Sequence, residues 1–396
     1  MKRKLLHPAV ALVAAMITIA ISSLADDSTI SVSARQRYPW NGLVDVHFTI
    51  TGDAGTKYDT SFTAKDMVGN TNIAMRTIRK ADGTAAAAKE LLLPGTYNWV
   101  WDAAADLPKD FKCDRVTVTG TANEEPLYMV IDLSGGANAS SYPVSYLDDV
   151  PSGGWSDAYK TTKLVLRMIE PGSFKMGGSY NVTLTKPFYI GVFEVTQKQY
   201  LLVKGSNPSD LGGDKRPVEM ISYNAIRGSS NGAKWPSSTA VDAVSFMGKI
   251  RARTGLNFDL PTDAQWEYAC RAGTTSSYNN GGSNETDLQA LGRYNGNQSD
   301  GHGECSQHTV VGSYQPNAWG LYDMHGNVWE WVLYWYGNIS GGTDPKGASS
   351  GTRRVIRGGG WHNDASFCTS SRRYSIESPG SFFSDDGFRI CLTLDE

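Results

Sequence analysis

Short runs in the first third of the chain alternate hydrophobic and polar residues. Residues 44–50 place Val, Val, Phe and Ile at every second position, and residues 97–101 repeat the pattern with aromatic side chains. A period of two is typical of half-buried β-strands. A further alternation at residues 116–118 follows, and turn residues separate the runs. The pattern predicts an all-β, immunoglobulin-like sandwich over residues 28–121, in which we see no catalytic motif.

Two helix-start signals lie farther along the chain. Thr196 and Thr262 are each followed three residues later by a glutamine, which is the pattern of a capping box. The second helix is predicted over residues 263–272, because Gly273 is a typical residue just after a helix end. One face of this helix is predicted to be buried, and it carries Trp266, Ala269 and Cys270.

Residues 163–396 combine both kinds of pattern. Alternating runs at residues 164–168 and 188–193 predict strands, and the two capped helices lie among or after them. This mixture predicts an α+β domain of short strands, two helices and long loops. The preceding segment, residues 122–162, is predicted to be a linker or extended arm, because residues 134–156 are rich in Gly, Ser, Asn and Pro. Within it, residues 128–133 are a candidate for one more strand.

The N-terminus has the features of an export signal. Basic residues at positions 2–4 precede an apolar run at 9–21 and a small-x-small motif at 23–25. A membrane anchor needs about 20 apolar residues. The shorter run therefore favours a cleaved signal peptide over residues 1–25. We predict a bacterial-type protein that is secreted, periplasmic or displayed at the cell surface, without a membrane span after cleavage.

The composition argues against some partners and reactions. A net charge of −3 over 396 residues gives no electrostatic case for nucleic acid. Charged residues make up 19%, whereas 42 glycines and 11 tryptophans suit a loop-rich fold held by large aromatic anchors. The sequence has no nucleophile elbow, HExxH motif or phosphate-binding glycine loop.

The chain has 5 cysteines, an odd number, so at least one is free or pairs between chains. Export makes disulfides feasible. Four cysteines lie in the C-terminal half, and the three ways of pairing them cannot be separated from sequence. The cysteines are Cys113, Cys270, Cys305, Cys368 and Cys391.

Several sequence blocks carry a specific resemblance. Residues 260–274 read LPTDAQWEYACRAGT, and residues 317–331 read NAWGLYDMHGNVWEW. With the shorter blocks, they resemble the formylglycine-generating-enzyme (sulfatase-modifying-factor) family in the family's own order, over about residues 163–396. The shorter blocks are EVT at 194–196, PVE at 217–219, RGGGW at 357–361 and GFR at 387–389.

The resemblance implies a fold and a calcium site. The fold is a variant of the C-type-lectin-like fold with little regular secondary structure. The implied Ca²⁺ ligands are the side chains of Asp323 and Glu330 with the carbonyls of Gly326 and Val328. Hard oxygen ligands on a flexible loop suit calcium. Alternatively, the two carboxylates hydrogen-bond loop amides. Further candidates, for a second calcium site, are Asn295, Asn297 and Asp300.

The resemblance also implies copper chemistry, which this sequence contradicts. The family's aerobic enzymes oxidise a substrate cysteine with Cu(I) held by two cysteines five residues apart. Cys368 matches the second cysteine and is the candidate catalytic residue, but Asn363 takes the first place and Gly360 replaces the family's serine. An amide is a poor ligand for soft Cu(I), so the two-thiolate copper site cannot form. A mixed site with His362 is an alternative.

Cys368 also has a structural interpretation. In an exported domain it could form a disulfide, with Cys270 as the preferred partner, while Cys305 and Cys391 pair likewise. A structural disulfide would leave no thiol for copper. The functional reading of Cys368 therefore depends on its pairing.

Two functional hypotheses remain. In the first, the domain is a calcium-stabilised module that binds a peptide or carbohydrate, because tryptophan-rich loops offer large contact areas. In the alternative, it is an oxidoreductase that converts a peptidyl cysteine of sulfatases to formylglycine. Asn363 favours the first. The candidate ligand contacts are Trp329, Trp361, Arg372 and Arg373, with Tyr334 and Tyr336 beside them.

Overall fold

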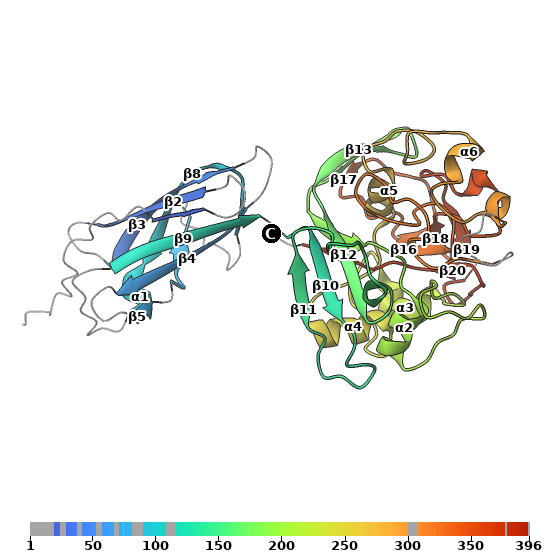
Figure 1. Ribbon diagram of the computed structural model, residues 1–396, viewed down its shortest axis with the longest axis horizontal. Helices are drawn as coiled ribbons and strands as arrows, with labels where there is room; N and C mark the ends of the chain where they lie inside the picture. Colours follow the sequence, from blue (N-terminus) through green and yellow to red (C-terminus); the bar gives the residue numbers. More distant parts are fainter. Residues whose placement is uncertain are drawn as a thin grey trace, which may run out of the picture. The chain divides into compact units, whose positions relative to one another are not determined.

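The chain forms two compact units, Met1–Glu125 and Pro126–Glu396 (Figure 1). Each encloses its own hydrophobic core, which is expected of separate domains. The computed structural model describes residues 20–23, 29–37, 42–52, 58–66, 71–73, 75–80, 90–107, 116–124, 126–299, 307–376 and 378–394.

The smaller unit is built from antiparallel strands. One sheet has the order β1-β2-β3-β8-β6, and in a second sheet β4 pairs with β5, β7 and β9. The elements are β1 (Ala20–Ser23), β2 (Thr29–Gln36), β3 (Leu43–Thr51), β4 (Tyr58–Asp66), β5 (Thr71–Ile73), β6 (Ile78–Arg79), β7 (Glu90–Leu92), β8 (Gly95–Asp102), the short helix α1 (Ala103–Asp106) and β9 (Val116–Glu124).

The alternation in the sequence becomes the buried face of this unit. Along β3, Val44, Val46, Phe48 and Ile50 are buried, and the residues between them are not. Trp101 of β8 lies in the same core. The predicted all-β region is therefore confirmed.

Most of the predicted signal peptide, residues 1–25, lies outside the described residues. Within it, Ala20–Ser23 form β1, which pairs antiparallel with β2. Across the part of the chain that the structure describes, every helix is too short or too polar to cross a lipid bilayer.

The central sheet of the larger unit has the order β11-β10-β12-β15-β21. The strand predicted at residues 128–133 is present as β10, whose buried hydrophobic residues pair with β12. The segment predicted as a linker or arm, residues 122–162, also supplies β11 to this sheet. The elements are β10 (Tyr128–Asp132), β11 (Val144–Leu147), the 3-10 helix η1 (Asp157–Lys160), β12 (Lys163–Ile169), β15 (Phe188–Gly191) and β21 (Cys391–Thr393).

Two smaller sheets complete the strands of this unit. One has the order β13-β14-β17, and the other, called here the β16 sheet, has the order β19-β18-β16-β20. Their strands are β13 (Gly172–Met176), β14 (Tyr180–Leu184), β16 (Trp329–Trp335), β17 (Gly342–Thr343), β18 (Arg354–Arg357), β19 (Tyr374–Ile376) and β20 (Asp386–Gly387).

The helices of the larger unit are short. In Figure 1, α2, α3 and α4 gather at the lower end of the unit, while α5 lies near β13 and β17. The helices are α2 (Gln197–Lys204), α3 (Tyr223–Arg227), α4 (Phe246–Thr254), α5 (Asp263–Arg271) and α6 (Glu285–Leu288), with the 3-10 turns η2 (Gly232–Lys234), η3 (Asn295–Asn297) and η4 (Ala365–Phe367).

Both predicted capping boxes are present. The Thr196 and Thr262 hydroxyls accept from the backbone amides three residues on. In return, the side-chain oxygens of Gln199 and Gln265 accept from the backbone amides of the two threonines. Helix α5 ends one residue earlier than predicted, because Ala272 already adopts the left-handed conformation. The predicted buried face of α5 is confirmed, since Trp266, Ala269 and Cys270 are fully buried.

Buried arginines hold α5 against the β16 sheet. Arg357 of β18 donates to Asp263 and Glu267 on the first turns of α5. Its guanidinium also donates to the carbonyls of Ser370 and Arg372, each at 3.1 Å. A guanidinium that satisfies several acceptors fixes the angle between elements better than apolar contact alone. The loops that follow β18 are thereby held beside α5.

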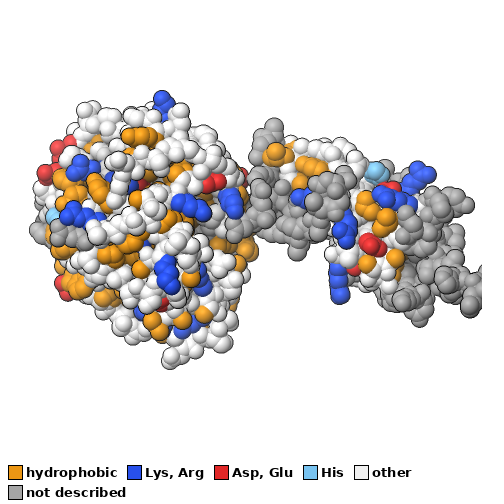
Figure 2. All heavy atoms as spheres, turned by 180° about the vertical axis from the view of Figure 1, so that it is seen from behind, with side chains coloured by type: hydrophobic (Ala, Val, Ile, Leu, Met, Phe, Trp, Pro, Cys, Tyr) orange, Lys and Arg blue, Asp and Glu red, His pale blue; other side chains and the backbone are white. Residues whose placement is uncertain are grey.

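Figure 2 shows one face of the larger unit. Lys and Arg side chains are scattered there among hydrophobic and neutral groups, with few acidic ones. The basic groups do not merge into one continuous patch on the face drawn.

Candidate functional site

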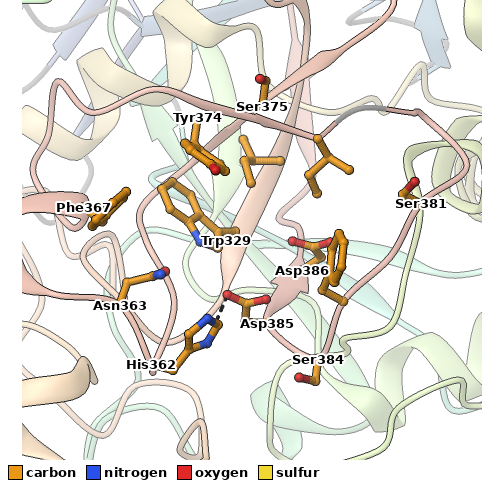
Figure 3. Close-up of a pocket in the computed structure, with 13 residues that line it drawn as sticks. Trp329, His362, Asn363, Phe367, Tyr374, Ser375, Ser381, Ser384, Asp385 and Asp386 are labelled. Atoms are coloured by element: carbon orange, nitrogen blue, oxygen red, sulfur yellow. Dashed lines mark ion pairs between the residues drawn. The ribbon is translucent and has the colours of Figure 1, made fainter.

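A cavity of about 570 Å³ lies on one face of the β16 sheet (Figure 3). Each strand of the sheet contributes to it: Ile376 from β19, Ile356 from β18, Trp329 from β16 and Asp386 from β20. Cavities of roughly 300–1,000 Å³ are the usual size of sites for small ligands or side chains. The cavity is therefore the candidate functional site.

The register of β16 and β20 places an aromatic ring beside a carboxylate. The two strands are parallel, and Trp329 is the partner of Asp386. Successive side chains of a strand face opposite ways, so the next residue, Glu330, points to the other side. There Glu330 accepts from Trp266 and Arg389 in the core. A single strand thus separates the cavity from the buried ion pairs.

Aromatic rings form one wall of the cavity. Trp329 stacks on Tyr374, with ring centroids 5.6 Å apart and an interplanar angle of 28°. Phe367 meets both rings nearly edge-on. Phe383 lines the cavity as well and is 56% exposed. The wall therefore combines the stacked rings of Trp329 and Tyr374 with the exposed ring of Phe383.

Carboxylates line the opposite part. Asp386 is 1% exposed, and its Oδ2 atom has no hydrogen-bond partner among the described residues. Burial, together with the neighbouring Asp385 carboxylate, raises the pKa of Asp386 to about 9. Burial also raises the pKa of Asp385, although His362 opposes the shift from 3.4 Å. Figure 3 shows His362 and Asp385 facing each other at the edge of the cavity.

Asp385 occupies space that a side chain at position 360 would need. A Cβ atom on Gly360 would lie 2.6 Å from Asp385 Oδ2. Real Cβ atoms do not approach that closely, so a larger residue at position 360 would require the Asp385 carboxylate to shift. The lack of a side chain on Gly360 therefore leaves room for Asp385.

Asn363 has a structural task in the loop. The side-chain Oδ1 atom of Asn363 accepts from the Gly360 backbone amide at 2.8 Å, and the backbone amide of Asn363 donates to the Gly360 carbonyl at 3.0 Å. The side chain closes the turn that carries His362 at the cavity edge. A short polar residue that bonds nearby backbone is typical of such turns.

Cys368, the candidate catalytic residue, does not line the cavity. Its side chain is fully buried and packs with Tyr278, Leu288, Leu291 and Tyr294. Burial raises the pKa of the thiol well above its usual range, with a further contribution from Asp364. The thiolate, which is the copper-binding form, is therefore disfavoured. His362 faces the cavity and Cys368 does not, so the alternative mixed site is not assembled.

The predicted disulfide of Cys368 with Cys270 is wrong, because both thiols are free. Cys270 points from α5 toward His325, with Sγ 3.8 Å from Nε2, whereas Cys368 packs into its own apolar cluster. Cys391 is free as well, and its predicted partner Cys305 lies outside the described residues, as does Cys113.

The predicted ligand contacts separate into two groups. Trp329 lines the cavity, and Arg372 lies nearby, with its guanidinium 4.5 Å from the centre of the Phe367 ring. Trp361 is half-buried beside His362 and does not line the cavity.

Arg373 and the two tyrosines lie elsewhere. Arg373 donates to Asp263 at 2.7 Å and to the Gly337 carbonyl at 2.6 Å, so its guanidinium braces the fold. Tyr334 is buried, and Tyr336 is exposed under the Arg373 guanidinium. None of these three side chains lines the cavity.

The predicted calcium ligands lie on the other side of β16. Both Glu330 oxygens are engaged, since Arg389 donates to each at 2.7 Å and Trp266 donates to one at 2.8 Å. Gly326 and Val328 lie in the loop before the strand, where their amides donate to Gly358 and Glu194. Within the described residues, no three His, Cys, Asp or Glu side chains converge as a metal-binding group.

Asp323 differs from Glu330 in having a free oxygen. Its Oδ2 accepts from the Gly312 amide at 2.6 Å, whereas the buried Oδ1 has no hydrogen-bond partner among the described residues. Burial raises the pKa of Asp323 to about 6. Asp323 therefore has an oxygen that is open to a further partner, whereas both oxygens of Glu330 already accept from Arg389.

Sequence reasoning missed the acidic side of the cavity. Asp385 and Asp386 directly precede the closing GFR block, and two adjacent acids in a block that otherwise packs in the core are an unusual feature. This pair of acids was the sequence feature that could have indicated the acidic side of the cavity. The aromatic partners of Trp329, namely Phe367, Tyr374 and Phe383, had no signal in the sequence, because they come from separate loops.

Comparisons with known proteins identify related chains. A family model described as "Sulfatase-modifying factor enzyme 1-like domain" matches residues 156–394. A chaperone protein LppX of Paenibacillus barcinonensis is 33% identical over 260 residues, covering 57% of this chain and 88% of the relative. A formylglycine-generating enzyme of Mus musculus is 32% identical over 186 residues, covering 44% of this chain and 49% of the relative.

The chain spans about half the length of this mouse enzyme. Among solved structures, Treponema denticola variable protein 1 is 30% identical, with a TM-score of 0.48, over 58% of this chain and 95% of that one.

Proposed function

The chain belongs to the sulfatase-modifying factor enzyme 1-like family over residues 156–394, and from this membership we propose that its larger unit is a ligand-binding module without copper oxidase activity. The observation that carries the proposal is the state of the two copper positions. Asn363 is committed to a turn through the Gly360 amide, and Cys368 is buried in an apolar cluster. Soft Cu(I) has neither two thiolates nor an accessible one.

An extended polypeptide segment is the proposed ligand. The Trp329–Tyr374 wall and the exposed Phe383 give a large apolar contact area at small entropic cost, which suits a peptide or a sugar ring. One relative that matches over most of its own length is named a chaperone protein, and this name favours a polypeptide over a carbohydrate.

The alternative is a formylglycine-generating oxidoreductase acting on peptidyl cysteine. Its support is the identity of 32% to the mouse enzyme, over about half of that enzyme's length. The family fold can carry a binding site or a reaction, so the site decides between them. Cu(I) affinity and peptide oxidation therefore separate the two functions.

The purified protein is expected not to bind Cu(I) with sub-micromolar affinity, and not to convert a Cys-x-Pro-x-Arg peptide to an aldehyde. The measurements are a competitive Cu(I) titration and mass spectrometry of the peptide, with a formylglycine-generating enzyme as positive control. The Asn363→Cys variant is expected to stay inactive, because Cys368 remains buried. An aldehyde product from the wild-type chain would establish the oxidase instead.

We also propose a cellular location for the chain and an architecture for its two units. We propose export to the periplasm, the cell surface or the medium, from the basic and apolar N-terminal segment. The larger unit is proposed to be a C-type-lectin-like variant, because long loops connect its short elements. The smaller unit is proposed to be an immunoglobulin-like spacer, which accords with its antiparallel sheets.

Calcium binding is proposed at Asp323 rather than at the full predicted ligand set. Asp323 would supply a carboxylate oxygen, with the Gly326 and Val328 carbonyls as further candidates. Glu194 and Glu330 lie in the same buried surroundings, where Arg389 is fully buried and Lys160 acts on Asp323 as well. A bound divalent ion would add positive charge beside these three carboxylates.

Removal of calcium is expected to lower the melting temperature of the larger unit. A ligand that binds only the native state at 100 times its Kd stabilises it by about 2.7 kcal/mol. The measurement is a thermal melt in calcium and in chelator. The Asp323→Asn variant is the control, because an amide oxygen can still accept from Gly312 and asparagine tolerates the left-handed conformation at φ 55°. Equal melts of the wild type in both buffers would exclude the site.

A further inference from the structure

Asp386, which lines the cavity, has a carboxylate oxygen without a hydrogen-bond partner among the described residues. Asp386 is almost fully buried, and its Oδ2 atom accepts no hydrogen bond from the described residues. A buried polar atom without a hydrogen-bond partner is costly, and a ligand that supplies the partner is one explanation for it. Asp386 is one of the residues that line the cavity.

The ring faces around this carboxylate attract positive charge. Trp329 is the strand partner of Asp386, and its ring stacks on Tyr374. The faces of aromatic rings carry negative potential, and a cation within about 6 Å of a ring centre gains roughly 0.5–2 kcal/mol. The chain itself provides an instance, since the Arg372 guanidinium lies 4.5 Å from the centre of Phe367.

A second carboxylate adds to the negative charge at the same place. Asp385 lies beside Asp386 and pairs with His362, whose side chain is 48% exposed. Gly360 leaves the room that the Asp385 carboxylate fills. Glu219 adds to the negative potential at Asp385. Among the residues that line the cavity, His362 alone can carry a positive charge.

We propose that the cavity selects an organic cation on an apolar stem; this inference rests on the proposed binding function. The Asp386 carboxylate would hold the cation, and the rings of Trp329 and Tyr374 would cover it. An ammonium or a guanidinium group at the end of a basic side chain has this chemistry. Its methylene stem would lie along Ile356 and Ile376 on the sheet, and its charged end would reach Asp386. In an extended peptide this cation would be the anchoring side chain.

Binding is expected to strengthen as the pH rises. Without a bound cation, the Asp386 carboxyl group is protonated near neutral pH, because burial and Asp385 raise the pKa of Asp386 to about 9. A cation must displace that proton, so the affinity of a guanidinium ligand should rise about tenfold per pH unit between pH 7 and pH 8. The groups that face Asp386 and Asp385 are His362, whose Nδ1 lies 3.4 Å from Asp385 Oδ2, and Glu219.

The experiment compares charged probes with neutral ones of matched shape. Calorimetric titrations of the full chain use N-acetyl-arginine amide against N-acetyl-citrulline amide, and N-acetyl-lysine amide against N-acetyl-norleucine amide. Each cation is expected to bind at least tenfold more tightly than its neutral counterpart. The stronger of the two cations identifies the preferred group, guanidinium or ammonium.

Two variants with the same change of charge test the assignment. Asp386→Asn keeps the shape and is expected to lose at least tenfold in affinity for the cation, along with its pH dependence. Asp364→Asn is the matched control, because Asp364 is exposed and does not line the cavity. Urea unfolding of both variants separates a loss of binding from a loss of fold.

The outcomes distinguish this inference from the proposed function. Equal affinities for arginine and citrulline probes, an unchanged affinity in Asp386→Asn, or no binding of any cation would overturn the cation site. If neutral or aromatic peptides still bind, and Trp329→Ala abolishes their binding, the binding module stands without the cation preference. An aldehyde product in the oxidation assay would overturn the proposed function itself.

Discussion

Replacing Arg389 by leucine is expected to lower the free energy of unfolding of the larger unit by about 3–5 kcal/mol. Arg389 is fully buried and donates to both oxygens of Glu330. It also donates to the carbonyls of Gly191 and Tyr322, at 2.8 and 2.9 Å. Without the guanidinium, Glu330 retains the Trp266 indole as its remaining hydrogen-bond donor. Typical domains have only about 5–15 kcal/mol of stability, so the loss is a large share.

The surrounding carboxylates make the effect depend on pH. Glu194 and Asp323 already have raised pKa values through burial, and Arg389 opposes both shifts. In the variant these pKa values rise further, so the folded state binds more protons than the unfolded state. Stability then falls as the pH rises. The deficit relative to the wild type is therefore expected to be smaller at pH 5 than at pH 8.

Urea unfolding followed by tryptophan fluorescence measures the change. The transition of the smaller unit, reported by Trp99 and Trp101, is an internal reference that should not move. Arg372→Leu is the matched control, because Arg372 is exposed, and it should change stability by about 0.5 kcal/mol or less. If Arg389→Leu costs no more than this control, the buried ion pair does not stabilise the fold.

Replacing Trp266 by alanine is expected to cost about 3–5 kcal/mol. The indole is fully buried in the main core, and its Nε1 donates to Glu330 at 2.8 Å. The Arg357 guanidinium lies 5.5 Å from the ring centre. The substitution therefore leaves a cavity between α5 and the β16 sheet and removes a donor from a buried carboxylate. Both effects act against the folded state.

Two further variants separate these contributions. Trp266→Phe keeps most of the ring and removes the donor, so it should cost about 1–3 kcal/mol. Trp361→Ala is the control for loss of an indole, because Trp361 is only half-buried and donates to the Ser384 carbonyl at 3.4 Å. A cost for Trp266→Ala equal to that of Trp361→Ala would contradict the central place of Trp266. Guanidinium unfolding curves give all three values.

Local sequence signals predicted the elements that depend on nearest neighbours. The capping boxes at Thr196 and Thr262 define helix starts because donor and acceptor lie three residues apart. The alternation in β3 predicted its buried face because strand side chains have a period of two. The strand at residues 128–133 was predicted as well, but its place beside β12 in the central sheet was not, because strand pairing depends on distant segments of the chain.

The candidate site was only partly within reach of the sequence. Trp329 and position 363 were identified, because they lie in blocks that resemble the family. The disulfide between Cys270 and Cys368 was not correct, since sequence gives no direction for a side chain in a loop. Asp385 and Asp386 are adjacent in the sequence, but their burial beside Trp329 follows from the pairing of β20 with β16.

The sequence by itself determined the family, the α+β character of the larger unit and the capped helices, and it predicted that Asn363 stands in the place of one of the family's copper cysteines. Those features rest on residue identity and on contacts within a few positions of the chain. The tertiary structure decided that Arg389 donates to both oxygens of Glu330 and that Cys368 is buried. It also decided that Asp386 lines a cavity and that one of its oxygens has no partner among the described residues. These properties depend on the solvent and the partners that distant segments bring to each side chain, and burial changes the chemistry of a carboxylate or a thiol more than its sequence neighbours do.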